Sequence, residues 1–282
     1  MDRYAVIGHP VAHSRSPQIH TLFAEATRQD MCYERIGPEL DQFEVAVTQF
    51  MAEGGKGLNV TLPFKERAFA LADVQSARAR AAGAANTLTF YKGEIFADNT
   101  DGVGLVRDIV QNQHFTLAHR SILLLGAGGA ARGVIQLLLA EGPIRLIIAN
   151  RTAGRALTVL SELRASGVVS EDLLAHCQAC GLESISAEHF DVVINATSSS
   201  LSGGSTPGVP AEVFGPETLA YDMVYGKGLT PFLALARTHG ALLLSDGLGM
   251  LVEQAAESFY LWRNVFPHTA PVLQQLRVEL LE

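Results

Sequence analysis

Cysteines, basic runs and long apolar segments are all scarce in this chain, and each shortage argues against a class of protein. The 282 residues include only three cysteines, an odd number that argues against a disulfide-stapled secreted domain and indicates a reducing compartment. The first residues lack the charged and apolar regions of a secretion signal. We therefore expect a cytoplasmic protein.

Long apolar and strongly basic stretches are missing as well. No apolar run approaches the roughly 18 residues that a membrane-spanning helix needs, because glycines, Arg132 and Glu141 interrupt the richest window, 122–148. The formal net charge is −8 without a basic cluster, which argues against nucleic acid and membranes as partners. Hydrophobic residues make up 48% of the chain, which is typical of a globular protein, and the length allows two domains with separate cores.

The first hundred residues alternate short apolar runs with helix-like segments. This alternation predicts a mainly parallel sheet with helices on both faces, and ligands bind at the carboxyl ends of the strands in such sheets. Ser16-Pro17 is typical of a helix start, with serine as the cap. The expected strands are 4–7, 32–36, 57–62, 86–91 and 94–97, the last two joined by a turn at Lys92-Gly93, and a second helix is expected at 40–51.

The middle of the chain predicts a doubly wound nucleotide-binding sheet, with expected strands at 121–125, 145–149, 191–195, 219–224 and 241–245. A linking helix begins near Gly102, and helices at 249–264 and 271–281 end the chain. The segment 165–188 is interpreted as a helix-and-loop excursion. We expect an α/β fold of two domains with a cleft between them. The substrate domain comprises 1–101 and 247–282, and the Rossmann-type cofactor domain comprises 102–246.

A glycine loop follows the first strand of the second domain. Gly126, Ala127, Gly128, Gly129, Ala130 and Ala131 fit the GxGxxA fingerprint, in which glycines allow a tight turn and a close approach to a pyrophosphate. The following helix start offers free N–H groups and a positive dipole end to phosphates. The loop therefore predicts a dinucleotide cofactor.

The end of the next strand distinguishes NADP from NAD. An acidic residue there would bind the ribose hydroxyls of NAD, whereas this chain has Asn150, Arg151 and Thr152, with Arg155 one turn later. Two guanidinium groups suit a 2′-phosphate. NADP is therefore expected, with solvated arginines at a helix start as the alternative.

Two polar clusters, 59–65 and 99–102, follow short apolar strands and supply Lys65, Asp101 and several amides and hydroxyls for one small, oxygen-rich ligand. Three candidate site residues also have a structural interpretation when each is considered alone. Lys65 is then an exposed lysine at a helix start, Ser16 a helix cap and Gln254 a surface side chain.

The pair Cys177 and Cys180, beside His176, lacks further zinc ligands. We interpret it as two thiols on a surface helix or loop, with redox chemistry as the alternative, and expect no metal.

The chain resembles the shikimate dehydrogenases from end to end. The resemblance rests on motifs in the family's order at 14–16, 59–65, 83–87, 99–102, 126–131, 150–152, 195–198 and 246–250. It implies the NADP-dependent interconversion of 3-dehydroshikimate and shikimate, a step toward chorismate and the aromatic amino acids.

The resemblance also implies the roles of individual residues. Lys65 and Asp101 would form the catalytic pair, and Ser14 and Ser16 would bind the substrate carboxylate. The ring hydroxyls would be bound by Thr61, Asn86, Asp101 and Gln254, with Asn59 and Tyr225 nearby. The cofactor residues would be Gly126 to Ala130 at the pyrophosphate, Asn150, Arg151, Thr152 and Arg155 at the adenosine phosphate, and Met223 and Gly247 beside the nicotinamide.

Two rival functions stay open at this point. A quinate/shikimate dehydrogenase would use a broader range of substrates and cofactors, and it is disfavoured by Asn150-Arg151 in place of an acidic residue. A silent dinucleotide-binding paralogue would be expected to have lost Lys65 or Asp101, and both are here. The expected partner is the small-molecule substrate, and the sequence leaves open whether the chain forms a homodimer.

Overall fold

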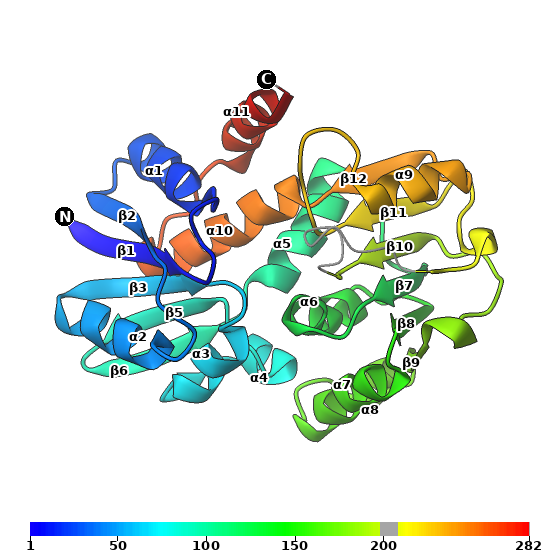
Figure 1. The fold of residues 1–282 in the computed structure, drawn as a ribbon, viewed down its shortest axis with the longest axis horizontal. Coiled ribbons are helices and arrows are strands. Elements are labelled where there is room, and N and C mark those ends of the chain that lie inside the picture. Colours follow the sequence, from blue (N-terminus) through cyan, green and yellow to red (C-terminus); the bar gives the residue numbers. More distant parts are fainter. Residues whose placement is uncertain (198–207, 282) are drawn as a thin grey trace.

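Two six-stranded sheets, one after the other along the chain, dominate the computed structural model, which describes residues 1–197 and 208–281 (Figure 1). Ser198, the last residue of the 195–198 motif, lies outside the described residues. The α/β class predicted from the alternation of strands and helices is confirmed. No helix in the described ranges has the length and apolar character of a membrane span.

The first sheet has the strand order β2-β1-β3-β5-β6-β4. β1, β2 and β3 are parallel, while β5 runs antiparallel to both β3 and β6. The predicted turn at Lys92-Gly93 joins β5 to β6, and both residues have positive φ, 52° and 88°. β4 was not predicted, because two residues are too few to show a pattern. The strands are β1 Asp2–Ile7, β2 Met31–Ile36, β3 Gly55–Val60, β4 Val74–Gln75, β5 Thr87–Tyr91 and β6 Glu94–Asp98.

Helices from both ends of the chain cover this sheet. On one face, Phe43 and Phe64 stack at 4.7 Å in a cluster with Ala5 and Ile7 of β1. On the other face, Ile19 and Phe23 pack against apolar residues of the two C-terminal helices, which return across the first unit (Figure 1). The helices are α1 Ser16–Thr27, α2 Phe43–Ala52, α3 Lys65–Leu71, α4 Ala77–Ala82, α10 Leu248–Arg263 and α11 Thr269–Leu281.

The second sheet is parallel throughout, in the order β12-β11-β10-β7-β8-β9. Residues 122–125 of β7 are fully buried and alternate between two apolar clusters, one on each face. The strands are β7 Ser121–Leu125, β8 Arg145–Asn150, β9 Cys177–Gly181, β10 Val192–Asn195, β11 Leu219–Asp222 and β12 Leu243–Asp246. The helices are α5 Asp101–Arg107, α6 Gly129–Ala140, α7 Ala153–Ala165, α8 Glu171–Leu174 and α9 Pro231–Thr238, and a π-helical turn, Asp108–Asn112, follows α5.

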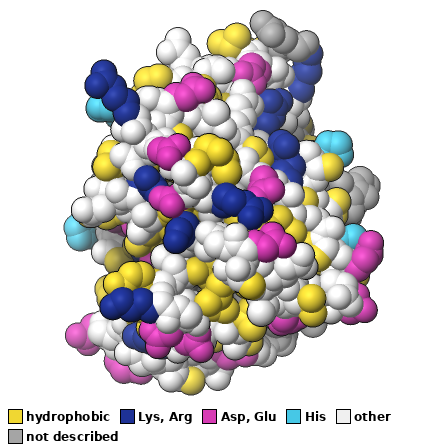
Figure 2. All heavy atoms as spheres, turned by 90° about the vertical axis from the view of Figure 1, so that its left-hand side faces the viewer, with side chains coloured by type: hydrophobic (Ala, Val, Ile, Leu, Met, Phe, Trp, Pro, Cys, Tyr) yellow, Lys and Arg dark blue, Asp and Glu magenta, His cyan; other side chains and the backbone are white. Residues whose placement is uncertain are grey.

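The surface view in Figure 2 looks at the molecule from the side of the first sheet. Basic and acidic side chains are interspersed across this face. Ion pairs such as Arg3–Glu34 and Arg67–Glu44 join opposite charges in the first unit. This mixed surface agrees with the absence of a basic cluster from the sequence.

The segment 165–188 differs from the prediction, because it contains the edge strand β9. Cys177 and Cys180 therefore lie on a strand, and their predicted position on a surface helix or loop was wrong. Residues three apart on a strand point to opposite faces of the sheet. Cys177 belongs to the apolar cluster on one face and Cys180 packs against the cluster on the other. The two thiols cannot converge on one ligand without breaking the strand.

We expect mild oxidation of the native protein to leave Cys177 and Cys180 unbridged. Their side chains point away from each other, and burial raises the pKa of the Cys177 thiol to about 12, so that little thiolate forms at neutral pH. Peptide mapping by mass spectrometry after treatment with diamide measures this. Cys32 on β2 serves as the unpaired reference thiol. A Cys177–Cys180 bridge formed under native conditions would contradict the assignment of β9.

His20 is a buried titratable residue in the first unit. It has no exposed surface, and its ring stacks on Tyr33 with centroids 4.2 Å apart. Its Nε2 lies 3.1 Å from Asn59 Oδ1, while Nδ1 has no partner in the described part of the chain. Burial lowers the pKa of His20 to about 3, so the imidazole is neutral at neutral pH.

The neutral state of His20 predicts acid sensitivity. The unfolded chain has a histidine pKa of about 6.5, so it binds more protons than the folded chain between that value and the folded pKa. The free energy of unfolding should therefore fall by about 2 kcal/mol between pH 7 and pH 5 through this residue alone. Urea unfolding at the two pH values measures it. In His20→Gln the pH difference should shrink by that amount, and in the exposed control His268→Gln it should persist. An equal pH difference in parent and His20→Gln would rule this out.

Candidate active site

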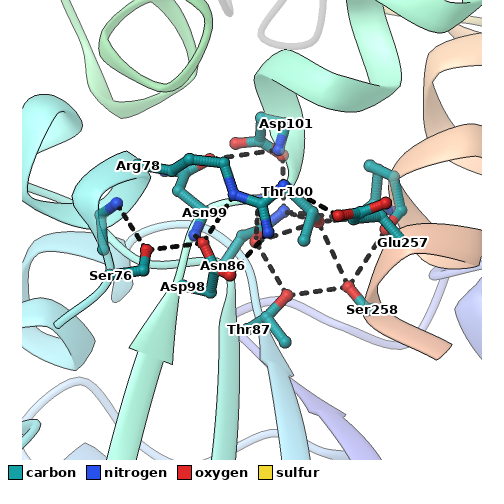
Figure 3. A network of polar contacts seen from close by, with 12 residues as sticks. Ser76, Arg78, Asn86, Thr87, Asp98, Asn99, Thr100, Asp101, Glu257 and Ser258 are labelled. Carbon is teal, nitrogen blue, oxygen red and sulfur yellow. Dashed lines mark hydrogen bonds and ion pairs between the residues drawn. The ribbon is translucent and has the colours of Figure 1, made fainter. Parts of the chain in front are cut away.

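Polar residues collect at one edge of the first sheet, where β3 ends and β5 begins. Asn59 lies near the end of β3 and pairs in register with Thr87 of β5. Because these strands are antiparallel, the start of β5 lies at the same edge as the end of β3. Thr61 follows β3, Lys65 opens α3, Asn86 precedes β5, and Asp101 opens α5. The predicted clusters at 59–65 and 99–102 therefore meet in space, through the contact between Lys65 and Asp101. Figure 3 shows the residues 98–101 beside Asn86 and Thr87.

Lys65 and Asp101 form an ion pair at the centre of this edge. Lys65 Nζ donates to Asp101 Oδ2 at 2.5 Å, and the side chains are only 14% and 7% exposed. The carboxylate also lies in the first turn of α5, where the helix dipole favours negative charge. The prediction that lysine and carboxylate share one site is supported by this contact. The alternative of an exposed lysine does not fit its burial.

Asn86 binds the other oxygen of Asp101. Its Nδ2 donates to Asp101 Oδ1 at 2.8 Å, and it lies 3.2 Å from Oε1 of Gln254 on α10. Gln254 is 9% exposed, so the alternative of a surface side chain is wrong. A hydrogen bond between side-chain amides thus joins Asn86 and Gln254, which are 168 positions apart in the sequence. Each Asp101 oxygen has its own donor, which fixes the plane of the carboxylate.

The serine loop precedes α1. The helix cap is Arg15, whose side chain makes no capping bond, and the predicted cap at Ser16 is wrong. Instead, the Ser16 N–H donates to Ser14 Oγ at 3.3 Å, and the Arg35 guanidinium donates to Ser14 O at 2.7 Å. No hydrogen bond or ion pair in residues 1–197 and 208–281 joins this loop to Lys65 or Asp101. Tyr225 packs against the apolar cluster formed by α1, α10 and α11.

The glycine loop lies beside the ion pair. Gly126 has a φ of +118°, and a Cβ there would lie 3.2 Å from the carbonyl group of Ala196, so only glycine fits this turn. A Cβ on Gly128 would meet open space. A Cβ on Gly129 would lie 3.9 Å from Cβ and Cδ of Lys65. The fingerprint therefore faces the lysine directly, across the boundary between the two sheets.

Helices α5 and α6 approach each other through two glycines, Gly102, which the sequence analysis named as the start of the linking helix, and Gly133, which it did not single out. A Cβ on Gly133 of α6 would lie 2.9 Å from Asn99 Oδ1 and 3.1 Å from Asp101 Oδ2. A Cβ on Gly102 of α5 would lie 2.8 Å from the Gly133 carbonyl oxygen. The sequence did contain a signal for this close approach. Glycine destabilises the interior of a helix, so a glycine within a predicted helix indicates close packing at that position.

The residues predicted to distinguish NADP from NAD lie at the carboxyl end of β8. Asn150 Nδ2 donates to the Thr152 carbonyl at 3.0 Å, which turns the chain into α7. Arg151, Thr152 and Arg155 are exposed. Neither arginine forms an ion pair within the described ranges. Two unpaired guanidinium groups beside a dinucleotide fingerprint fit a phosphate on the adenosine ribose.

Met223 and Gly247 lie together at the carboxyl ends of β11 and β12. A Cβ on Gly247 would lie 2.2 Å from the Met223 carbonyl oxygen, so a larger residue would push the two segments apart. The Met223 N–H donates to the carbonyl of Asn195, from the 195–198 motif, at 2.9 Å. In the described ranges, no group of three or more histidine, cysteine, aspartate or glutamate side chains has the arrangement of a metal site.

Three family models match the chain in order. Residues 6–88 match the shikimate dehydrogenase substrate binding domain, residues 108–202 match shikimate / quinate 5-dehydrogenase, and residues 247–277 match the shikimate 5'-dehydrogenase C-terminal domain. The first and third matches coincide with the two segments that pack together in the first unit.

Individual relatives are similar over their full lengths. Shikimate dehydrogenase (NADP(+)) of Dechloromonas aromatica is 54% identical over 99% of both chains, and that of Methylobacillus flagellatus is 53% identical over 98% of this chain and 99% of its own. The crystal structure of an Ael1 enzyme from Pseudomonas putida is 51% identical, with a TM-score of 0.89 over 98% of both chains. Shikimate 5-dehydrogenase from Thermus thermophilus, solved with NADP(H) and shikimate, is 32% identical, with a TM-score of 0.83 over 99% of both chains. The chain belongs to the shikimate dehydrogenase family.

Proposed function

We propose that this chain is an NADP-dependent shikimate dehydrogenase, which reduces 3-dehydroshikimate to shikimate and catalyses the reverse reaction. The observation that supports this most strongly is the position of the glycine loop, where Gly129 lies beside the Lys65 side chain. A dinucleotide whose pyrophosphate lies on that loop would be bound next to the Lys65–Asp101 pair. The relatives from Dechloromonas aromatica and Methylobacillus flagellatus carry this activity in their names. The free thiols of Cys32, Cys177 and Cys180 support the predicted cytoplasmic location.

Lys65 acts as the proton donor in the reduction. Bound NADPH would supply the hydride, and negative charge would then develop on the carbonyl oxygen of the substrate. The Lys65 ammonium stabilises this charge and transfers a proton to the oxygen, and in shikimate oxidation the neutral amine withdraws that proton. Asp101 holds the ammonium in place through its 2.5 Å contact. Asn86 holds Asp101 in turn, so the donor is oriented before substrate arrives.

The substrate domain comprises 1–101 and 247–282, and the cofactor domain comprises 102–246. Ser14 and Ser16 bind the substrate carboxylate. The ring hydroxyls are bound by Thr61, Asn86, Asp101 and Gln254, with Tyr225 and Asn59 close to them. The buried amides and the carboxylate at the sheet edge support these roles, since a polyhydroxylated ring requires donors and acceptors that are already oriented.

The cofactor residues form three groups along the carboxyl edge of the second sheet. Gly126, Ala127, Gly128, Gly129 and Ala130 bind the pyrophosphate. Asn150, Arg151, Thr152 and Arg155 bind the adenosine and its 2′-phosphate. Met223 and Gly247 lie beside the nicotinamide, next to the start of α10. An absorbance assay at the nicotinamide band, offering shikimate and quinate with NADP and NAD, distinguishes this function from the broader quinate/shikimate dehydrogenase.

Replacing Lys65 with methionine should lower the turnover number about 10²- to 10⁴-fold, because general acid–base catalysis typically contributes that factor. The Michaelis constants for shikimate and NADP should change far less, since most binding groups lie elsewhere. Steady-state kinetics measure both. Lys56→Met, at an exposed lysine on β3, is the control and should match the parent. Turnover near the parental rate in Lys65→Met would move the proton donor to another residue.

Replacing Arg151 with alanine should raise the Michaelis constant for NADP about 10- to 100-fold, the loss expected for a hydrogen bond to a charged group. The constant for NAD should stay nearly the same, because NAD lacks the 2′-phosphate. Kinetics with both cofactors at saturating shikimate measure the difference. Arg237→Ala, at an exposed arginine of α9, is the control. An equal loss with both cofactors would mean that Arg151 supports the fold.

A further inference from the structure

The amide of Asn86 has only one orientation that satisfies its surroundings. The backbone N–H of Thr100 can only donate, and it donates to Asn86 Oδ1 at 2.8 Å. The Nδ2 group must then face Asp101, which it contacts at 2.8 Å. The Thr87 hydroxyl supplies a further donor to Asn86 Oδ1, at 2.9 Å. Thr87 thus helps to keep the donor side of Asn86 turned toward the carboxylate.

The orientation of the Asn59 amide follows from its neighbours in the same way. The backbone carbonyl of Asn86 can only accept, and it lies 3.2 Å from Asn59 Nδ2. On the other side, the Tyr33 hydroxyl donates to Asn59 Oδ1 at 2.7 Å. The amide hydrogens of Asn59 also face the Thr87 hydroxyl at 3.2 Å and the Ser258 hydroxyl at 3.0 Å. Asn59 therefore uses both ends of its amide inside the protein.

These contacts form a continuous chain of hydrogen bonds, which the Ser258 hydroxyl joins at Thr87, 2.8 Å away, where either hydroxyl can donate. Tyr33 donates to Asn59, Asn59 to Thr87, Thr87 to Asn86, and Asn86 to Asp101. Figure 3 shows the last part of this chain, with Thr87 and Ser258 below Asn86 and Asp101. Hydrogen bonds that run head to tail polarise one another, so the final acceptor gains most when it is negatively charged. That final acceptor is the Asp101 carboxylate.

The far end of the chain donates to Asn59. Burial raises the pKa of Tyr33 well above its ordinary value, so its hydroxyl keeps the proton. The neutral His20 ring stacks on Tyr33 and turns Nε2 toward the Asn59 oxygen. Because that oxygen accepts, Nε2 carries the ring hydrogen. The Tyr33 hydroxyl and His20 Nε2 therefore both donate to Asn59 Oδ1, and this keeps the Asn59 amide hydrogens directed toward Thr87 and Ser258.

We propose that Tyr33 and Thr87 are positioning residues of the active site, acting through Asn59 and Asn86 to orient Asp101 toward the substrate. This proposal rests on the function proposed above. Neither residue touches the ion pair. They fix the amide that fixes the carboxylate, and this carboxylate holds Lys65 and binds a ring hydroxyl. A rotated Asn86 would present an oxygen to Asp101 in place of a donor.

The test is to remove single hydroxyl groups and measure steady-state kinetics. Thr87→Val should raise the Michaelis constant for shikimate about tenfold and lower the turnover number about tenfold, because small misplacements of reacting groups are costly. The Michaelis constant for NADP should stay at the parental value. Thr87→Ser, which keeps the hydroxyl, should restore both parameters. The matched control is Thr89→Val, two residues along the same face of β5, whose side chain makes no hydrogen bond within the described ranges.

Tyr33→Phe tests the far end of the chain and does not depend on whether Thr87→Val folds. It should raise the Michaelis constant for shikimate about threefold, with Tyr91→Phe at the exposed end of β5 as control. Parental constants in both Thr87→Val and Tyr33→Phe, or a Thr87→Ser protein as impaired as Thr87→Val, would overturn the proposal. If the parent protein does not oxidise shikimate with NADP, the proposed function fails instead. An active parent with unaffected variants refutes only the positioning role.

Discussion

The hydrogen-bonded ion pair of Lys65 and Asp101 can form only because segments that are far apart in the sequence meet at one sheet edge. Lys65 opens the helix after β3, and Asp101 opens the helix that leaves the first sheet for the second. Both helices begin at the same edge because β5 and β6 form an antiparallel hairpin, which brings the chain back to the end of β3. Charge-assisted hydrogen bonds of this kind are strong when the pair is shielded from water. The remaining site residues are arranged around this contact.

Close packing of α5 against α6 then joins this pair to the second sheet. Gly102 and Gly133 allow the two backbones to approach, and Gly133 leaves space for the Asp101 side chain itself. The same helix α6 begins at Gly129, the glycine that faces Lys65. One helix therefore carries the end of the glycine fingerprint and forms part of the wall around the Asp101 carboxylate. The position of the glycine loop relative to Lys65 depends on this contact between the two helices.

Much of this arrangement could be predicted from the sequence, because it depends on local patterns. The strand 121–125 was predicted with its observed ends, since four consecutive apolar residues lie between Ser121 and Gly126 of the glycine loop. The strand β9 was missed because Cys-Gln-Ala-Cys-Gly has neither alternation nor an apolar run, and its position depends on pairing with β8. Gln254 could not be assigned locally either. Its neighbours on α10 are buried in a different cluster, and only the return of that helix brings it to Asn86.

A network of charged residues next to the site could not have been predicted from sequence spacing. The partners in this network are determined by the register between strands and by the packing of helices from distant parts of the chain. Arg78 on α4 binds Asp98 through two hydrogen bonds and Glu257 on α10 through a third. Glu257 in turn binds Arg107 of α5 at 2.8 Å. Two cations and two anions thus balance in a half-buried network, in which an unpaired charge would be costly. Asp98 also accepts from the Asn99 N–H at 2.7 Å, so the network anchors the loop that ends at Asp101. The geometry of the Lys65–Asp101 pair is therefore maintained from two sides, by neutral hydrogen bonds across the sheet and by paired charges between the helices.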